Sequence, residues 1–398
     1  MDRVILHCDM NGFFASCELL DYPELVDKPM AVCGDPNSRH GIILAKNEIA
    51  KKYGIVTAET LWQAKKKCPD LVLVPPHHDK YRAISKEINK IYLQYTDMVE
   101  PFSIDESWLD VTASQNLFGD GKTIADKIRE QVKEELHLTL SAGVSYNKIF
   151  AKMGSEYKKP DATTVITRDN YKELLWPMDV SELFFCGFAT AEKLKKSGIN
   201  TIGALAQANP VYLTSLLGSQ GKLLWEYANG LDNSPVCLYN QREKIKSVGN
   251  GVTFRRNLTT EEDVLTAITA LSHKVAYRLR NYGLKANGVK VDIKDPQFQV
   301  ISRQQQLFTP TNLGDDIKNT AMAIIKRSWH LPSPIRLLTV TAINLVDEDC
   351  STQLSLFDDK NSNTNKELEE AMDKIKGKFG EGSITFGQIL DNDIGVDL

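Results

Sequence analysis

Short apolar runs alternate with amphipathic stretches along residues 1–168. Five segments have the length and branched apolar content of buried strands or open on such a strand: 3–10, 30–34, 41–55, 71–75 and 101–111. Apolar residues recur at helical spacing in three others: 12–20, 80–95 and 121–136. Residues 139–160 pass from a strand into a helix that Pro160 ends. This mixture predicts an α/β or α+β core.

The pattern changes after residue 170. Short helical pieces separated by glycines fill 170–235 and predict a small helical domain, and 232–244 has the polar composition of a linker. Strand-like and helix-like segments resume over 246–346 and predict a small sheet backed by two helices. The last fifty residues are polar apart from 353–357 and an amphipathic helix over 365–379.

Composition places the chain among ordinary soluble globular proteins, with 398 residues, 42% apolar and 25% charged. It has no apolar run of membrane-spanning length, and it starts without the features of a secretory signal, so we expect a cytoplasmic protein. The seven cysteines include no Cys-x-x-Cys pair, which favours neither a zinc site nor a disulfide framework.

Charge is distributed unevenly, although the net value is only −4. Residues 241–346 carry 16 Lys and Arg against 8 Asp and Glu, whereas 347–398 carry 5 against 13. A basic module before an acidic tail suits a polyanionic partner, and the alternative is two solvated surfaces of opposite sign.

Three acids interrupt apolar segments: Asp9 at the end of the first strand, and Asp105 with Glu106 inside 101–111. Magnesium prefers oxygen ligands, and two such ions can activate a hydroxyl and neutralise a leaving phosphate. Because strand neighbours point to opposite faces, Asp105 and Glu106 can share a site only at a turn or bulge. The alternative is that each acid is a helix cap or a turn residue.

Three segments carry a family resemblance: CDMNGFFASCE (8–18), FSIDESWLDVT (102–112) and SAGVSYNKIFAKMGSEYKKPDATTVI (141–166). Together they resemble the Y family of DNA polymerases, and both its polymerase IV-like and UmuC-like branches are close. The resemblance runs from residue 1 to about 357. It implies a multidomain right-hand architecture of the α/β (α+β) class. The implied parts are palm (1–18 and 77–168), small fingers (19–76), helical thumb (169–234), linker (235–244), α+β little finger (245–347) and tail (348–398).

The implied activity is template-directed, low-fidelity translesion DNA synthesis in DNA repair and damage tolerance, connected with the SOS response and mutagenesis. Two Mg²⁺ ions, replaceable by Mn²⁺, would serve nucleotidyl transfer from a dNTP to a primer 3′-hydroxyl. By resemblance, Asp9 and Asp105 would bridge both ions and Glu106 would hold the ion beside that hydroxyl. The backbone carbonyl of Met10 would complete the other shell.

The resemblance also implies a nucleotide site formed by Phe13, Phe14, Lys51 and Lys159. Phe14 falls at the steric-gate position, where a ring excludes a ribose 2′-hydroxyl; its alternative is an ordinary core Phe. Lys159 would contact the triphosphate. The fingers depart from the family pattern, because Glu48 replaces a Tyr and Lys51 an Arg. Asn11 replaces the second Asp of the Asp-Met-Asp motif, as in UmuC-like chains.

Duplex DNA would be held by the thumb and the little finger. Residues 184–206 resemble a helix-hairpin-helix in which Cys-Gly-Phe-Ala replaces the usual Gly-x-Gly turn. Candidate phosphate contacts in the basic module are Lys246, Arg255, Arg256, Arg278, Arg280 and Arg303. The implied partners are primer-template DNA and dNTP; we expect a monomer without membrane contact, associated with the nucleoid when it acts.

The tail holds a pentapeptide that matches the peptide by which bacterial polymerases bind the beta subunit of the replication sliding clamp: Gln353, Leu354, Ser355, Leu356 and Phe357. Leu356 and Phe357 are apolar anchors suited to a pocket. The alternative is a tail strand folded on its own domain. We expect the acidic remainder to stay free of DNA, with packing of the 365–379 helix on the body as the alternative.

Two rival functions fit parts of the pattern. A palm-type nucleotidyl cyclase also pairs acids on a sheet, but it has no use for a thumb, a basic module or a clamp peptide. A catalytically inactive scaffold bound to the clamp would not need Asp9, Asp105 and Glu106.

Overall fold

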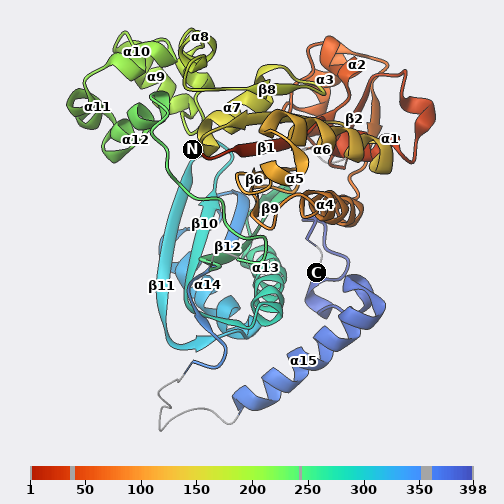
Figure 1. Cartoon of the computed structure of the whole chain (residues 1–398). Helices are drawn as coiled ribbons and strands as arrows, with labels where there is room; N and C mark the ends of the chain where they lie inside the picture. The colour runs from red at the N-terminus through yellow and green to blue at the C-terminus, as the bar shows by residue number, and fades with distance from the viewer. Residues whose placement is uncertain (1, 36–40, 242–243, 351–360, 397–398) are drawn as a thin grey trace. The chain divides into compact units, whose positions relative to one another are not determined.

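A five-stranded sheet in the order β5-β6-β1-β7-β8 organises the first part of the chain (Figure 1). Its strands are β1 (Ile5–Met10), β5 (Val99–Pro101), β6 (Glu106–Asp110), β7 (Leu140–Ser145) and β8 (Thr163–Val165). Central β1 pairs antiparallel with both β6 and β7, so it is held on both edges. Every residue of β1 is buried, which explains its nearly continuous apolar sequence.

Helices cover both faces of this sheet. One face packs on α4 (His78–Tyr92) and α6 (Gly121–Leu136), whose apolar stripes join Leu6 and Cys8 in one core. On the other face α7 (Lys148–Tyr157) packs against β1 and β7, and its Ala151 lies in a cluster with Ile5. A Cβ at Gly143 would lie 1.8 Å from the backbone oxygen of Ala151, so α7 approaches β7 this closely only because Gly143 has no side chain. The short α5 (Gln115–Phe118) precedes α6.

A smaller three-stranded sheet, in the order β3-β2-β4, lies between β1 and α4 in sequence. Its strands are β2 (Met30–Cys33), β3 (Ile43–Lys46) and β4 (Val72–Val74). The accompanying helices are α1 (Phe13–Leu19), η1 (Pro23–Leu25), α2 (Glu48–Lys52) and α3 (Leu61–Lys67). Thr60 and Gln63 form a capping box at the start of α3. Helix α1 contacts β2 and β3, and this joins the smaller sheet to the end of β1.

Residues 171–228 form only helices, as the glycine-punctuated pattern predicted. They are α8 (Tyr171–Leu175), η2 (Val180–Glu182), α9 (Phe188–Lys196), α10 (Ile202–Gln207), α11 (Pro210–Leu217) and α12 (Ser219–Ala228). Their apolar side chains share a core with Ile149, Phe150 and Met153 of α7. The helical segment is therefore continuous with the helix that covers the five-stranded sheet.

The structure describes residues 2–35, 41–241, 244–350 and 361–396, and the chain divides into two units, 1–242 and 243–398. The second unit has a four-stranded antiparallel sheet in the order β11-β10-β12-β9. Its strands are β9 (Ser247–Leu258), β10 (Leu284–Lys294), β11 (Val300–Thr311) and β12 (Ile335–Asp347). Two helices, α13 (Glu261–Asn281) and α14 (Gly314–Ser328), cover one face, as the sequence predicted.

The end of the chain folds onto the second unit. It contains α15 (Asn361–Phe379), η3 (Glu381–Ser383) and η4 (Gly387–Ile389). Ile389, Ile394 and Val396 are buried in the same core as α13 and α14. The expectation of a free tail is therefore wrong for residues 389–396, whose apolar side chains complete a core. Packing of the 365–379 helix on the body is confirmed, since Glu369 and Asp373 pair with Arg280 of α13.

Nothing in the described part of the chain resembles a membrane-spanning helix in length and apolar character. The division of the chain into palm, fingers, thumb, little finger and tail at the predicted residues stays a prediction.

Candidate active site

Asp9 and Glu106 lie directly opposite each other on neighbouring strands. They are register partners of the antiparallel pair β1 and β6, so their side chains leave the sheet on the same face. That face is the one covered by α7, because His7, two residues before Asp9, contacts Ser155 of α7. Two carboxylates are thus held side by side on rigid strands.

Asp105 belongs to the hairpin turn between β5 and β6, one residue before β6 begins. Its backbone oxygen accepts a hydrogen bond from Met10 N (3.1 Å), which ties the turn to the end of β1. Its carboxylate accepts a hydrogen bond from Ser103 Oγ (2.6 Å). Asp105 thus lies in a turn directly before Glu106, as the sequence reasoning required, and Met10 lies beside them as the last residue of β1. That both carboxylates share one metal site stays a prediction.

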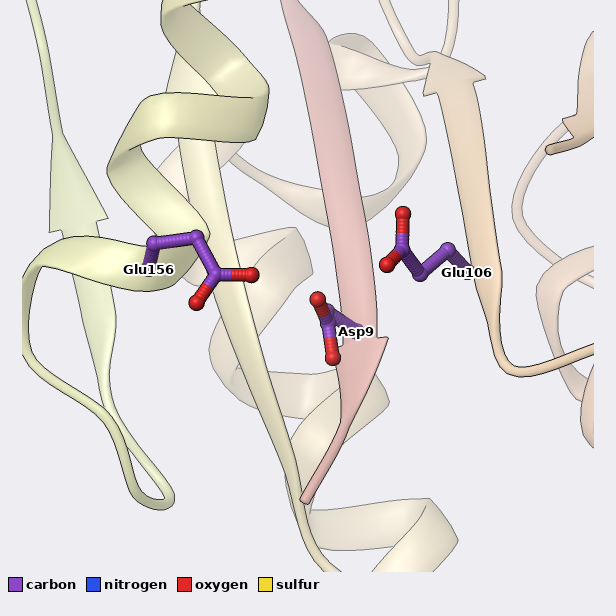
Figure 2. Close-up of side chains that lie close together, drawn as sticks. All are labelled: Asp9, Glu106 and Glu156. Carbon is purple, nitrogen blue, oxygen red and sulfur yellow. The ribbon is translucent and has the colours of Figure 1, made fainter. Parts of the chain in front are cut away.

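A third acid joins the first two from α7 (Figure 2). Asp9, Glu106 and Glu156 each place a carboxylate oxygen within 4.8 Å of the others. Figure 2 shows Asp9 between the other two, with the three carboxylates pointing toward one another. The sequence reasoning missed Glu156 and included Asp105, whose carboxylate is held by Ser103 instead.

Two lysines neutralise this cluster. Lys159 Nζ lies 2.8 Å from Asp9 Oδ2 and 2.9 Å from Glu156 Oε1. Lys152 Nζ lies 2.5 Å from Glu106 Oε2. Lys152, Glu156 and Lys159 recur at intervals of four and three residues, which is the spacing of one helical face, and this signal in the sequence could have identified the set.

The carboxyl groups of the cluster differ in pKa because their surroundings differ. Burial raises the pKa of Asp9 to about 8, against the opposing effect of Lys159. Burial also acts to raise the pKa of Glu106, but hydrogen bonding to His7 and Lys152 outweighs it and lowers the value to about 2. Burial in turn lowers the pKa of the fully buried His7 to about 4. Glu106 therefore keeps its negative charge to a lower pH than Asp9 does.

These residues fit a divalent cation. The donors are carboxylate oxygens, which hard ions such as Mg²⁺ prefer, and they converge from two strands and a helix. Three acids brought this close repel one another, and a bound cation would relieve the repulsion that Lys152 and Lys159 now reduce. Asp105 can join them by exchanging its contact with Ser103 for an ion.

Asn11 supports the loop that carries Lys159. Its amide oxygen accepts a hydrogen bond from Asp161 N (2.9 Å), and its amide nitrogen donates to Ser141 Oγ (3.0 Å). Asn11 is thus a structural link between β1, β7 and the segment after α7.

A pocket of about 230 Å³ opens next to Asp105. Its lining residues are Gly12, Phe13, Phe14, Leu44, Ala45, Lys46, Thr57, Ile104 and Asp105. Phe13 is only 3% exposed and packs mainly into the core, whereas Phe14 is partly exposed. The ring of Phe14 stacks on Tyr81 at a centroid distance of 4.3 Å. An aromatic ring and a lysine thus share a pocket with one of the predicted metal-binding acids.

Lys51 lies outside the lining of this pocket. It is on α2, 55% exposed, with its Nζ 3.6 Å from Glu48 Oε1. Lys46, at the end of β3, lines this pocket. Lys51 as a nucleotide contact stays a prediction.

Two family models match the chain. The impB/mucB/samB family matches residues 8–156, and the C-terminal domain of the same family matches residues 245–356. DNA polymerase IV of Acetivibrio thermocellus is 47% identical over 393 residues, with 98% of each chain covered. DNA polymerase IV of Clostridium kluyveri is 36% identical over 397 residues, covering 98% of this chain and 99% of that one. The chain belongs to the Y family of DNA polymerases.

The fold agrees with this membership. A solved Y-family DNA polymerase chimera superposes with a TM-score of 0.75 at 23% sequence identity, over 86% of this chain and 99% of the chimera. The right-hand polymerase architecture predicted from the sequence is therefore confirmed, and by class the protein is a DNA-directed DNA polymerase.

The turn before α9 belongs to the segment that resembles a helix-hairpin-helix in sequence. Gly187 is the N-cap of α9, and Phe185 adopts a positive φ of 69°. The helix-hairpin-helix and its turn stay predictions. The side chain of Phe188, at the start of α9, is 84% exposed.

The six candidate DNA contacts of the polymerase have different surroundings. Arg280 is 11% exposed and forms ion pairs with Glu369 and Asp373 of α15. Arg256 pairs with Asp263 and Asp393, each at 2.7 Å. Both guanidinium groups are already occupied, so a phosphate would have to displace carboxylates.

The other four candidates are more accessible. Arg278 donates to Gly249 O (2.9 Å), and Arg255 and Lys246 are exposed. Arg303, on edge strand β11, is the register partner of Val291, which faces the helices. All six stay predictions as DNA contacts.

The face of the second unit's sheet opposite α13 and α14 carries side chains that the sequence reasoning did not select. Val289, Val291 and Ile293 of β10 face the helices, so Lys290 and Lys294 face away. Asp292 faces the same way, and Lys290 Nζ lies 3.1 Å from its Oδ2. Their neighbours on that face are Ser302, Gln304, Thr339 and Thr341, with Val300 and Leu337 beside Lys294. Gly249 and Gly251 pair with the two threonines and leave this face flat. The predicted clamp peptide, 353–357, lies outside the described residues.

Proposed function

We propose that this polymerase extends a primer on a DNA template, past damaged bases, by two-metal nucleotidyl transfer. The observation that carries the proposal is the position of the β5–β6 hairpin. Glu106 faces Asp9 on one side of it, while Asp105 lines the pocket that contains Phe14. Metal-binding acids and a nucleotide-sized pocket thus meet at one turn. Bound Mg²⁺, or Mn²⁺ in its place, would activate the primer 3′-hydroxyl and neutralise the charge on the leaving pyrophosphate.

The residues of the chain divide this work. Asp9, Asp105 and Glu106, with the backbone carbonyl of Met10, hold the ions. Glu106 stays ionised because Lys152 and His7 favour its anion. Lys159 lies 2.8 Å from Asp9, and a triphosphate oxygen competes with Asp9 for its ammonium group.

Phe14 selects the sugar by excluded volume. Its ring lies in the pocket with one face covered by Tyr81, so it cannot move aside for a 2′-hydroxyl. The fingers helices α2 and α3 have only five and seven residues, which supports loose inspection of the nascent base pair and hence low fidelity. Such an enzyme serves DNA damage tolerance, including the SOS response, in the cytoplasm.

Duplex DNA is held by the second unit. The face that carries Lys290 and Lys294 offers cations, amides and hydroxyl groups to a polyanion, and a phosphate there would compete with Asp292 for Lys290. Residues 353–357 bind the sliding clamp.

Primer extension with Mg²⁺ and dNTPs tests the proposal. We expect template-dependent extension by the wild type, loss of at least about a thousandfold in Asp105→Ala, and normal rates in Asp70→Asn. Asp70 is an exposed carboxylate of the first unit outside the cluster, which makes it a matched control. Absence of extension by wild-type protein at low salt would refute the polymerase proposal.

The two rivals give different results in the same experiment. A nucleotidyl cyclase would convert free triphosphate to a cyclic product without DNA. An inactive scaffold would bind the clamp and would not extend a primer.

A further inference from the structure

Lys46 is the last residue of β3 and enters the Phe14 pocket from the fingers. Its backbone is fixed by pairing with Ala31 of β2, and its Nζ donates to Thr57 Oγ1 at 3.2 Å. The pocket also contains Asp105, so a cation and a metal-binding acid share one cavity of about 230 Å³. The side chain is half-buried, which limits the directions in which its charge can point.

Lys46 forms no ion pair with any carboxylate in the described part of the chain. Lys159 and Lys152 are each within 3 Å of a carboxylate oxygen, and Lys51 is 3.6 Å from Glu48. Thr57 supplies only a neutral acceptor to Lys46. Burial lowers the pKa of Lys46 and Lys51 lowers it further, against smaller opposing effects of Glu48 and Glu59, neither of which forms an ion pair with it in the described part of the chain. A half-buried cation with a neutral partner and a cationic neighbour is stabilised by an anion from outside the protein.

The chain brings Lys46 close to the sugar gate. Gly12, two residues before Phe14, has a φ of 54°, and a Cβ there would lie 3.3 Å from the backbone oxygen of Lys46. The turn before α1 therefore packs directly on the end of β3. Phe14 and Lys46 line one cavity because this contact leaves no room for a side chain between the two segments.

We propose that Lys46 binds the phosphates of the incoming deoxynucleoside triphosphate. This inference rests on the proposed function and adds a nucleotide-contacting residue to it. With the sugar against Phe14 and the metal-bound phosphates near Asp105, a phosphate oxygen falls between these two residues, where the ammonium of Lys46 can reach it. Lys46 thereby brings a positive charge into the pocket from β3. Lys51 lies on the exposed surface of α2 and does not line the pocket.

The test compares Lys46→Met, Lys46→Arg and the control Lys52→Met. Lys52 is an exposed lysine of α2, so its replacement removes the same charge from the same part of the chain without touching the pocket. KM for dNTP and kcat are measured in primer extension. The Kd for dNTP is measured separately on a complex with a dideoxy-terminated primer, which cannot react.

We expect Lys46→Met to raise both KM and Kd for dNTP by about tenfold or more, as loss of a charge-assisted hydrogen bond does. In Lys46→Met we expect kcat and the Kd for primer-template to change by less than about threefold. Lys46→Arg should recover most of the affinity for dNTP. Lys52→Met should match the wild type in all of these values. Thermal unfolding of each variant shows whether it is folded.

Three results would overturn the inference. The first is an unchanged Kd for dNTP in folded Lys46→Met. The second is an equal loss of affinity in Lys52→Met, which would show a diffuse charge effect. The third is a loss of primer-template affinity as large as the loss of dNTP affinity, which would make Lys46 a DNA contact. Failure of the wild type to extend a primer refutes the proposed function instead, so the two failures are distinct.

Discussion

Phe14 lies flat on Tyr81, with the two ring planes only 14° apart and the centroids separated by 4.3 Å. Tyr81 is fully buried in α4, and its hydroxyl donates to Glu18, which is one turn after Phe14 on α1. The stack and the hydrogen bond therefore join the same two helices at adjacent points. The orientation of the gate is set by a residue that is itself buried and does not line the pocket.

Sugar selection should depend on Tyr81 as well as on Phe14. We expect Phe14→Ala to lower the preference for deoxynucleotides over ribonucleotides by about a hundredfold, because the ring no longer fills the space of a 2′-hydroxyl. Tyr81→Leu should lower it by about tenfold, since the ring of Phe14 loses its support. Tyr81→Phe keeps the stack and should keep the selectivity. Single-nucleotide insertion kinetics with dNTP and rNTP measure the ratio, and a wild-type ratio in Tyr81→Leu would show that Phe14 needs no support.

Metal binding should become tighter as the pH rises toward about 8. Burial holds the pKa of Asp9 near that value, so below it the metal-free carboxyl is protonated and an ion must displace the proton. The apparent Kd for Mg²⁺ should therefore fall by up to about tenfold per pH unit below the pKa and level off above it. Titration calorimetry in buffers of different ionisation enthalpy measures the released proton. The Asp9→Asn variant cannot ionise at this position, so it should bind Mg²⁺ without releasing a proton. If the wild type binds Mg²⁺ and the buffer takes up no proton, the prediction is wrong.

Arg280 should contribute to stability more than to DNA binding. Arg280→Met leaves the buried Glu369 without its cation, which we expect to lower the free energy of unfolding by about 3 kcal/mol. Urea denaturation of the full chain measures this. Glu369 also accepts a hydrogen bond from Gly314 N (2.8 Å), which a glutamine can still accept. Arg280→Met combined with Glu369→Gln should therefore recover part of the loss, and full additivity of the two changes would argue against a coupled pair.

Lys290 should bind the DNA backbone. It lies on the face of the sheet opposite α13 and α14, beside Gln304 and Thr341, and a phosphate would displace its ion-pair partner Asp292. We expect Lys290→Ala to reduce the slope of log affinity against log salt by about 1 and to weaken binding equally for unrelated sequences. Fluorescence anisotropy over a range of salt concentrations gives the slope. The opposite pattern, with Arg280→Met altering the slope and Lys290→Ala leaving it unchanged, would place the duplex on the helical side.

Clamp binding should be tested by substitution and not by truncation. Phe357→Ala should abolish binding to the sliding clamp and leave both stability and synthesis without the clamp unchanged.

Removal of residues 361–398 should destabilise the second unit, because it takes away Ile389, Ile394 and Val396 at about 2 kcal/mol for each buried side chain. Calorimetry of the full and shortened chains measures the difference, and identical unfolding temperatures would mean that these residues do not support the core.

Strands β1 and β7 could be predicted because they are buried on both faces and so have continuous apolar sequences. Asp9 was identifiable for the same reason, as an acid at the end of such a strand. Strand β11 was not predicted: it is an edge strand with mostly exposed side chains, and Gln304, Gln305 and Gln306 break any alternation of apolar and polar residues.

The site residues that the sequence did not indicate act across long separations. Glu156 reaches Asp9 because α7 lies close against β7 at Gly143; the spacing of Lys152, Glu156 and Lys159 groups these three residues but does not report that distance. Lys46 and Lys51 are both lysines of the fingers, and only the turn of the chain between β3 and α2 decides which one lines the pocket. The same applies to Arg280, whose partners lie 89 and 93 residues later in the chain.

The burial of Val396 in the core of the second unit bears on how this protein is made. Ribosomes release a chain from its beginning, and the first unit can fold while the rest is still being synthesised. The second unit cannot close its core until Ile389, Ile394 and Val396 have emerged, long after β9 and α13. Until then the apolar faces of α13 and α14 are incompletely covered, so this half of the polymerase exposes apolar surface for longer during synthesis.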